Sequence, residues 1–98
     1  MKIVTGFIPD LRAAGYAPER VVLFGSYAKG RPHPLSDIDL AVWDQHFVGG
    51  GTADIAPIAH LVSKYPGLEG HTFALEDTAT NNPFAGDVLR SGVTLPLV

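Results

Sequence analysis

The sequence predicts a small α/β domain, in which helices alternate with the strands of one β-sheet. Short apolar runs rich in β-branched residues are bounded by glycine and proline, as expected for buried strands. Between them, apolar residues recur at helical spacing. With 98 residues, the chain is long enough for a single core, so we expect residues 1–98 to form one domain.

The first two elements are predicted to be a helix and a strand. Apolar residues recur at helical spacing between Phe7 and Ala14, and Gly15 can end this helix. Residues 20–24 form a β-rich run, and the glycine and serine that follow are expected to turn the chain into a short helix. The order so far is helix, strand, helix.

The middle of the chain is predicted to contain a strand and a longer helix. Residues 32–34, Pro-His-Pro, must form a loop, because proline fixes φ and donates no hydrogen bond. A second strand follows over residues 37–43, and residues 44–52 are expected to form a flexible connection. Asp54 is the predicted N-cap of a helix, in which Pro57 is tolerated because it falls in the first turn.

A strand, a helix and an edge strand are predicted to complete the chain. Residues 68–75 form the third strand. Asn82 caps a helix that ends before Gly92, and three apolar residues form its buried side: Phe84, Val88 and Leu89. Residues 93–98 form a terminal strand, which its proline restricts to an edge of the sheet.

Composition excludes several classes of function. A net charge of −3 argues against non-specific nucleic-acid binding, which needs a basic surface. The chain has no cysteine, and its four histidines lack zinc-ligand spacing. The apolar N-terminal stretch is too short to span a membrane and lacks signal-peptide features. We therefore expect a soluble cytoplasmic protein.

The strongest chemical signal is a pair of carboxylates that follows a glycine-serine turn. Asp37 and Asp39 are two residues apart on a predicted strand, so they share one face. Two like charges side by side destabilise each other unless a cation lies between them. The turn at Gly25 and Ser26 exposes backbone N–H groups to an anion, and ten residues separate it from Asp37. A divalent metal with a phosphate fits this pattern; ordinary solvent-facing carboxylates are the alternative.

Side chains near this turn have alternative interpretations. Lys29 and Arg31 either neutralise phosphate charge or belong to a solvated loop. Tyr27 and Trp43 either line a nucleobase pocket or pack against the domain, and packing is the more common outcome for large aromatics.

Two stretches of sequence carry a resemblance to a known family: Gly-Ser-Tyr-Ala-Lys-Gly over residues 25–30 and Ser-Asp-Ile-Asp-Leu-Ala-Val over residues 36–42. They resemble the nucleotidyltransferases of the DNA polymerase β superfamily. The closest likeness is to the minimal nucleotidyltransferases, small single domains often found as antitoxin partners of HEPN proteins. The resemblance implies a mixed sheet with flanking helices, as in the polymerase β palm. It also implies a Mg²⁺-dependent, two-metal transfer of a nucleoside monophosphate from ATP or another NTP.

The resemblance also assigns roles to individual residues. It implies that Gly25 and Ser26 hold the triphosphate, and that Asp37 and Asp39 bind the metal ions. The family has a third carboxylate on the following strand, which helps to activate the acceptor hydroxyl, and Glu69 is the candidate both for this role and for a third metal ligand. A solvated glutamate at the strand end is the alternative for Glu69.

The residues after Glu69 depart from the family pattern, which has an aspartate between apolar residues there. Gly70 and His71 occupy these positions. His71 shares a strand face with Glu69, so it orients that carboxylate, meets the substrate, or is a packed histidine. The glycines at 49–51 form either a lid over the nucleotide or a tolerant connection.

Two functions follow from these observations. The first is an enzyme that transfers a nucleoside monophosphate, AMP by preference, to a hydroxyl group of a HEPN-type partner protein or a small molecule. The second is an antitoxin subunit that acts by contact, with a weak or inactive nucleotide site. The intact glycine-serine turn and carboxylate pair favour the enzyme, whereas the altered surroundings of Glu69 favour the binding subunit.

Overall fold

The computed structural model describes residues 3–25, 28, 30 and 37–97. Within these residues, one mixed sheet has the strand order β3-β2-β1-β4. Its strands are β1 (Arg20–Phe24), β2 (Ile38–Trp43), β3 (Leu68–Phe73) and β4 (Val93–Thr94). β1 is antiparallel to both β2 and β4, whereas β2 and β3 run parallel. The parallel pair is possible because a helical connection returns the chain to the starting edge of β2.

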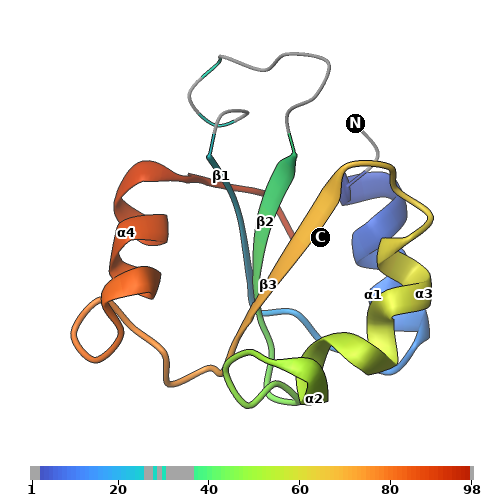
Figure 1. Ribbon diagram of the computed structural model, residues 1–98, viewed down its shortest axis with the longest axis horizontal. Helices are drawn as coiled ribbons and strands as arrows, with labels where there is room; N and C mark the ends of the chain where they lie inside the picture. Colours follow the sequence, from blue (N-terminus) through green and yellow to red (C-terminus); the bar gives the residue numbers. More distant parts are fainter. Residues whose placement is uncertain (1–2, 26–27, 29, 31–36, 98) are drawn as a thin grey trace.

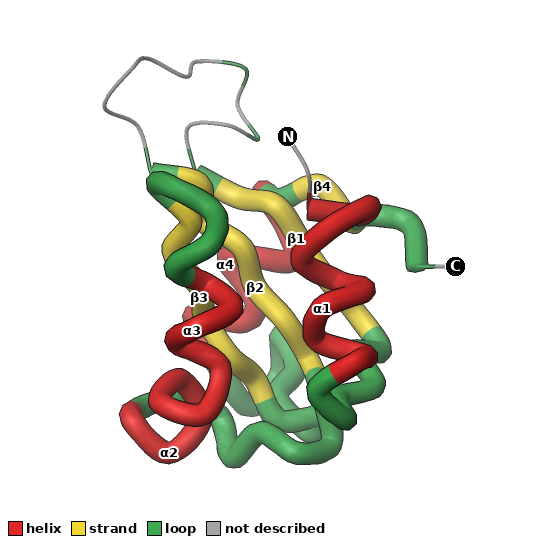
Figure 2. Tube along the Cα trace, turned by 90° about the vertical axis from the view of Figure 1, so that its right-hand side faces the viewer, coloured by secondary structure: helices red, strands yellow, loops and turns green. Residues whose placement is uncertain are grey.

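Helices cover both faces of this sheet. The helices α1 (Ile8–Ala13) and α3 (Ala59–Val62) lie on one side, and α4 (Pro83–Ser91) lies on the other (Figure 1). Figure 2 shows the face that α1 and α3 cover, with α4 behind the strands. The predicted small mixed sheet with flanking helices is confirmed. None of the described helices has the length and apolar character needed to span a membrane.

Alternation along the strands divides the core into two clusters. Towards α1 and α3, the buried residues include Val21, Leu40 and Val42, packed against Phe7, Ile8 and Leu11. Towards α4, they are Val22, Ala41, Trp43, Phe73, Ala85 and Val88. Successive strand residues point to opposite faces, so each strand contributes to both clusters. Asp39 therefore lies on the α4 side, with Ala41 and Trp43 further along that face.

The first helical segment agrees with the prediction and extends it. A π-helix over Ile3–Phe7 precedes α1, and Phe7, Ile8 and Leu11 are all buried. The Tyr65 hydroxyl donates a 2.9 Å hydrogen bond to Asp10 Oδ2. This bond ties α1 to the chain that leaves α3.

The predicted central helix is instead three short pieces: α2 (Thr52–Ile55), a 3₁₀ turn (Ala56–Ile58) and α3. Pro57 lies in the 3₁₀ turn, where its missing N–H cannot complete the α-helical hydrogen bonds. The prediction that Asp54 is the N-cap is wrong. Gly51 is the N-cap, and Asp54 lies inside α2 with its side chain directed back to the preceding loop.

The first predicted strand is confirmed over Arg20–Phe24, whereas the other three are correct in place but too long. β2 begins at Ile38 rather than Asp37, because its parallel pairing with β3 begins at Ile38 and Leu68. β3 ends at Phe73, since the Ala74 N–H donates to Asp77 Oδ2 in a turn (2.9 Å). β4 has two residues and lies at an edge as expected, and a proline without an N–H follows one residue later.

The C-terminal helix confirms its predicted cap and corrects one of its buried residues. Asn82 Oδ1 accepts hydrogen bonds from the N–H groups of Phe84 and Ala85, both at 3.1 Å. Val88 is buried as predicted, but the Phe84 side chain is 46% exposed. The apolar side of α4 is narrower than its spacing indicated, because Ala85 makes the close approach to the sheet.

Replacing Asn82 by alanine is expected to lower the free energy of unfolding by about 1 kcal/mol, because two N–H groups lose their acceptor. For a domain of this size, that corresponds to a fall in Tm of about 4–8 °C in a thermal denaturation followed by circular dichroism. Asn82→Asp is the control, since it keeps an accepting oxygen at the helix N-terminus. Equal Tm values for native protein and Asn82→Ala would show that the cap contributes nothing.

Candidate metal centre

Two acidic side chains meet where β2 and β3 begin. Asp39 on β2 and Glu69 on β3 are register partners in the parallel pair. Both belong to the face of the sheet that α4 covers, but neither is fully buried. The topology thus places side by side two carboxylates that are thirty residues apart in the chain.

The side chain of His71 lies beside these two carboxylates. Its Nε2 atom lies 3.4 Å from Asp39 Oδ1. Its ring makes edge contacts with Phe24 and Phe84, at centroid distances of 5.1 and 5.7 Å. Among the described residues, Asp39, Glu69 and His71 form a group whose ligand atoms all lie within 4.8 Å of one another. We call these three residues the metal group.

The donor set of the metal group fits a divalent cation. Two carboxylates at this separation repel each other, and a cation between them removes that repulsion. Carboxylate oxygens are ligands for Mg²⁺ and Mn²⁺, whereas an imidazole nitrogen suits transition metals. The side chains of Asp39 and His71 are 25% and 27% exposed, so an ion bound here remains accessible to a substrate.

Gly25 supports the metal group from the end of β1. It follows Phe24, the register partner of Asp39, and has a φ of +75°. A Cβ atom built on Gly25 would overlap Asp39 Oδ2. The absence of a side chain therefore lets the turn approach the carboxylate closely, and the left-handed backbone favours glycine for a second reason.

Replacing Gly25 by alanine is expected to displace the Asp39 carboxylate and weaken divalent-metal binding by about tenfold or more. Gly30→Ala is a matched control, because Gly30 has a similar φ of +68° but no atom of the described residues lies within 4 Å of an added Cβ. Each substitution should cost about 1 kcal/mol of backbone strain. Calorimetric titration of both variants with a divalent metal separates the effect of backbone strain from the effect of overlap with Asp39. Equal metal affinities of the two variants would contradict the close approach of Gly25 to Asp39.

The remaining predicted site residues are not part of the metal group. Asp37 is exposed and precedes β2. The predicted nucleotide ligands Ser26, Lys29 and Arg31 lie outside the described residues. So do Tyr27 and most of the helix expected after the turn.

The glycine loop at 49–51 is held by Asp54, an arrangement that the sequence analysis missed. The Asp54 carboxylate accepts hydrogen bonds from the N–H groups of Val48, Gly49 and Gly50 at 2.7–3.1 Å. It also accepts one from the Thr72 hydroxyl at 2.8 Å. Burial acts to raise the pKa of this carboxyl, but the hydrogen bonds outweigh burial and the pKa lies below its usual value. An acidic residue at the third helical position after glycine is the sequence signal for such a contact.

A cavity of about 190 Å³ opens between the glycine loop and the start of α4. Its lining includes His71, Phe84 and the backbone of the loop. Asp54 fixes one wall of this cavity, because Thr72, its hydrogen-bond donor on β3, also lines it. The metal group and the cavity share His71, so a molecule in the cavity would lie next to a bound ion.

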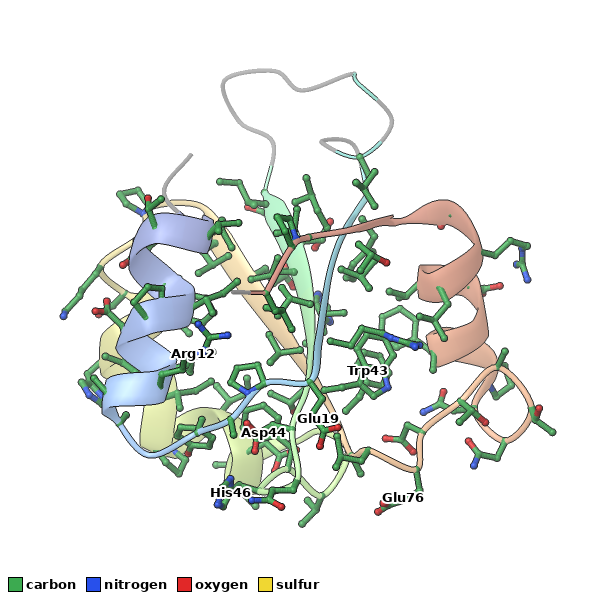
Figure 3. All side chains as sticks on the ribbon, turned by 180° about the vertical axis from the view of Figure 1, so that it is seen from behind. Arg12, Glu19, Trp43, Asp44, His46 and Glu76 are labelled. Carbon is green, nitrogen blue, oxygen red and sulfur yellow. The ribbon has the colours of Figure 1, made fainter. Side chains whose placement is uncertain are left out.

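The contacts of Trp43, Asp44 and His46 stabilise the fold, and none of these three residues belongs to the metal group. Trp43 is buried, stacks on Phe73 at 4.4 Å and donates from Nε1 to the Asp77 carbonyl at 2.8 Å, which agrees with the packing interpretation. Asp44 is fully buried and lies 2.7 Å from His46 Nδ1. Figure 3 labels Asp44 and His46, which come after the last residue of β2, whereas Asp39 lies near the start of that strand.

Comparison with known proteins finds a family model and a solved structure that are similar to this chain. The family model described as "Nucleotidyltransferase domain" matches residues 5–70, which is more than half of the chain. It includes Gly25, Asp39 and Glu69, and it ends one residue before His71. A chain from the crystal structure of a toxin-antitoxin with AMP-PNP superimposes with a TM-score of 0.66 at 26% sequence identity. That match covers 93% of this chain and 70% of the other. No protein with a curated description matches the chain.

Proposed function

The chain belongs to the nucleotidyltransferase domain family, and from this membership we propose that it transfers AMP from ATP to a hydroxyl group with the help of Mg²⁺ or a similar divalent ion. The single observation that carries the proposal is the in-register pair of Asp39 and Glu69 beside the turn at Gly25. A transferase of this kind needs carboxylates for the ions next to a backbone turn for the phosphates.

The proposed reaction is a displacement at the α-phosphorus of ATP. The acceptor hydroxyl oxygen forms a bond to this phosphorus, the bond to the bridging oxygen of the β-phosphate breaks, and pyrophosphate leaves. Asp37, Asp39 and Glu69 hold the ions, and Glu69 also accepts the hydroxyl proton. Bound divalent ions supply positive charge that stabilises the attacking oxygen and the leaving pyrophosphate. Ser26, Lys29 and Arg31 complete the proposed phosphate contacts.

A partner protein is the proposed source of the acceptor hydroxyl. The structural relative comes from a toxin-antitoxin crystallised with AMP-PNP, an analogue of ATP. The resemblance to minimal nucleotidyltransferases indicates a HEPN-type toxin as the partner. Under this proposal the chain is the antitoxin, and modification of the toxin is its mode of action.

A second candidate function is an antitoxin subunit that acts by contact and does not transfer nucleotides. One observation favours it: His71 contacts Asp39, so the metal group differs from a set made only of carboxylates. Under this alternative, the nucleotide site binds weakly or not at all.

Thermal denaturation separates the two candidates. A nucleotide that binds only the folded protein raises its stability, by about 2.7 kcal/mol at a hundred times Kd. We expect a rise in Tm with millimolar ATP and Mg²⁺, and none with ATP and a chelator. No shift with either would favour the contact-only subunit.

Transfer itself is tested by incubation with labelled ATP and the product of the neighbouring reading frame. The expected result is label on that protein, together with release of pyrophosphate. Incubation with each of the other labelled NTPs in turn measures the base preference. A protein that binds ATP but labels no partner would leave nucleotide binding intact and refute the transfer.

A further inference from the structure

We propose that His71 is a nitrogen ligand of the ion held by Asp39 and Glu69, and that it makes this centre prefer first-row transition-metal ions such as Mn²⁺ over Mg²⁺. The inference deepens the proposed function, because it concerns the ion of the same site. A site made of three carboxylates has no nitrogen ligand, and the inference assigns this role to His71.

The first support is the distance between His71 and Asp39. Nε2 and Oδ1 are 3.4 Å apart, which is longer than the usual hydrogen bond of about 2.9 Å. Two ligands at right angles around one ion, each at about 2.1 Å, are about 3.0 Å apart, and opposite ligands are about 4.2 Å apart. The separation of 3.4 Å lies inside this range, whereas the 4.8 Å that encloses the whole metal group lies somewhat above it, so the ligands draw closer together when an ion binds.

The second support is the way in which the His71 ring is held. Phe24 from β1 and Phe84 from α4 both make edge contacts with it, at interplanar angles of 61° and 73°. Phe24 precedes the metal group in the sequence and Phe84 follows it. Together, the two ring contacts limit rotation of the imidazole. Nε2 is therefore directed at Asp39 before an ion binds, which lowers the entropy cost of binding.

The third support is the chemistry of the donor set. Two carboxylates neutralise the charge of a divalent ion, and a neutral imidazole adds a ligand without adding charge. Mg²⁺ favours oxygen ligands and keeps several of its waters, whereas imidazole nitrogen suits transition metals. A site with two oxygen donors and one nitrogen donor therefore discriminates against Mg²⁺.

Electron paramagnetic resonance of bound Mn²⁺ tests the inference without any enzymatic assay. With the whole chain and Mn²⁺ alone, we expect electron spin-echo modulation from ¹⁴N, changing to the ¹⁵N pattern when the protein contains ¹⁵N-labelled histidine. In His71→Gln the nitrogen signal should vanish and the Kd for Mn²⁺ should rise about tenfold or more, while the Kd for Mg²⁺ changes less than about twofold.

The chain offers a matched control in His46. It also lies next to a carboxylate, Asp44, but this pair follows the end of β2, whereas Asp39 lies near the start of that strand. His46→Gln should keep the nitrogen signal and the affinity for Mn²⁺. If His71→Gln does not fold, a variant with His33, His46 and His60 all changed to Gln retains His71 as its sole histidine, and it should keep the signal.

The inference would be overturned by Mn²⁺ that binds without nitrogen modulation, or by a nitrogen signal that persists in folded His71→Gln. A chain that binds no Mn²⁺ at millimolar concentration also overturns it. These outcomes are distinct from failure of the proposed function. Nitrogen coordination without label transfer would support the metal ligand and refute the transferase, and transfer without nitrogen coordination would do the reverse.

Discussion

Replacing Asp39 by asparagine is expected to lower the rate of nucleotidyl transfer by about 10³-fold or more while the fold is retained. The Asp39 carboxylate belongs to the metal group and also lies against Gly25. Its charge therefore acts on both the bound ion and the adjoining phosphate site. The measurements are label transfer from ATP and the Mg²⁺-dependent rise in Tm. Both should be lost in Asp39→Asn.

Stability distinguishes this loss from unfolding. Without divalent ions, Asp39 faces Glu69 across β2 and β3, and removal of one of two like charges does not destabilise the pair. The Tm of Asp39→Asn without metal should therefore lie within about 2 °C of the native value. Asp87→Asn, on the exposed side of α4, is the control and should retain full transfer. Native activity in Asp39→Asn would refute the assignment, and full activity in Glu69→Gln would remove Glu69 from the site.

The largest effect on stability is expected at Asp54. In Asp54→Ala, three backbone N–H groups and the Thr72 hydroxyl lose their acceptor at a carboxylate that is 3% exposed. The expected loss in free energy of unfolding is about 3 kcal/mol, and the fall in Tm is about 15 °C. Urea denaturation measures it directly. Thr72→Val removes one of the four bonds and should cost about 1 kcal/mol.

The contribution of Asp54 should also depend on pH. Its pKa in the folded protein lies below the usual carboxyl value, so the folded protein binds the proton less readily than the unfolded chain. The stabilisation is fully present above about pH 5, where both forms are ionised, and is lost as the pH falls through the folded pKa. The difference in stability between native protein and Asp54→Asn should therefore shrink below about pH 4. A difference that is constant from pH 3 to 7 would contradict this assignment.

Most of the architecture follows from local patterns. The cap at Asn82 depends on residues within one turn, so the sequence is sufficient to predict it. The alternation of β2 likewise places Leu40 and Val42 on one face and Asp39 on the other, because side-chain direction repeats every two residues. The boundaries were less accurate at Asp37 and after Phe73, where strand length depends on the partner and on a side-chain turn.

The central helix shows where local patterns were insufficient. Apolar spacing predicted one helix, but Pro57 divides it, and Asp54 bonds to the loop before the helix instead of capping it. Both an N-cap and a backward-reaching carboxylate use the same residue types near a helix start. The choice between them depends on where the glycine loop and Thr72 lie, and these positions come from the packing of β3.

The motif of glycine, serine and alternate aspartates was sufficient by itself to indicate the family, because its chemistry is contained in a short stretch of chain. The partner of Asp39 could not be established in that way. Glu69 and His71 reach it through the parallel register of β2 and β3, and Phe24 and Phe84 hold the imidazole in place from two other elements. Contacts between distant segments depend on how the whole sheet assembles, so the metal group is a product of the tertiary structure.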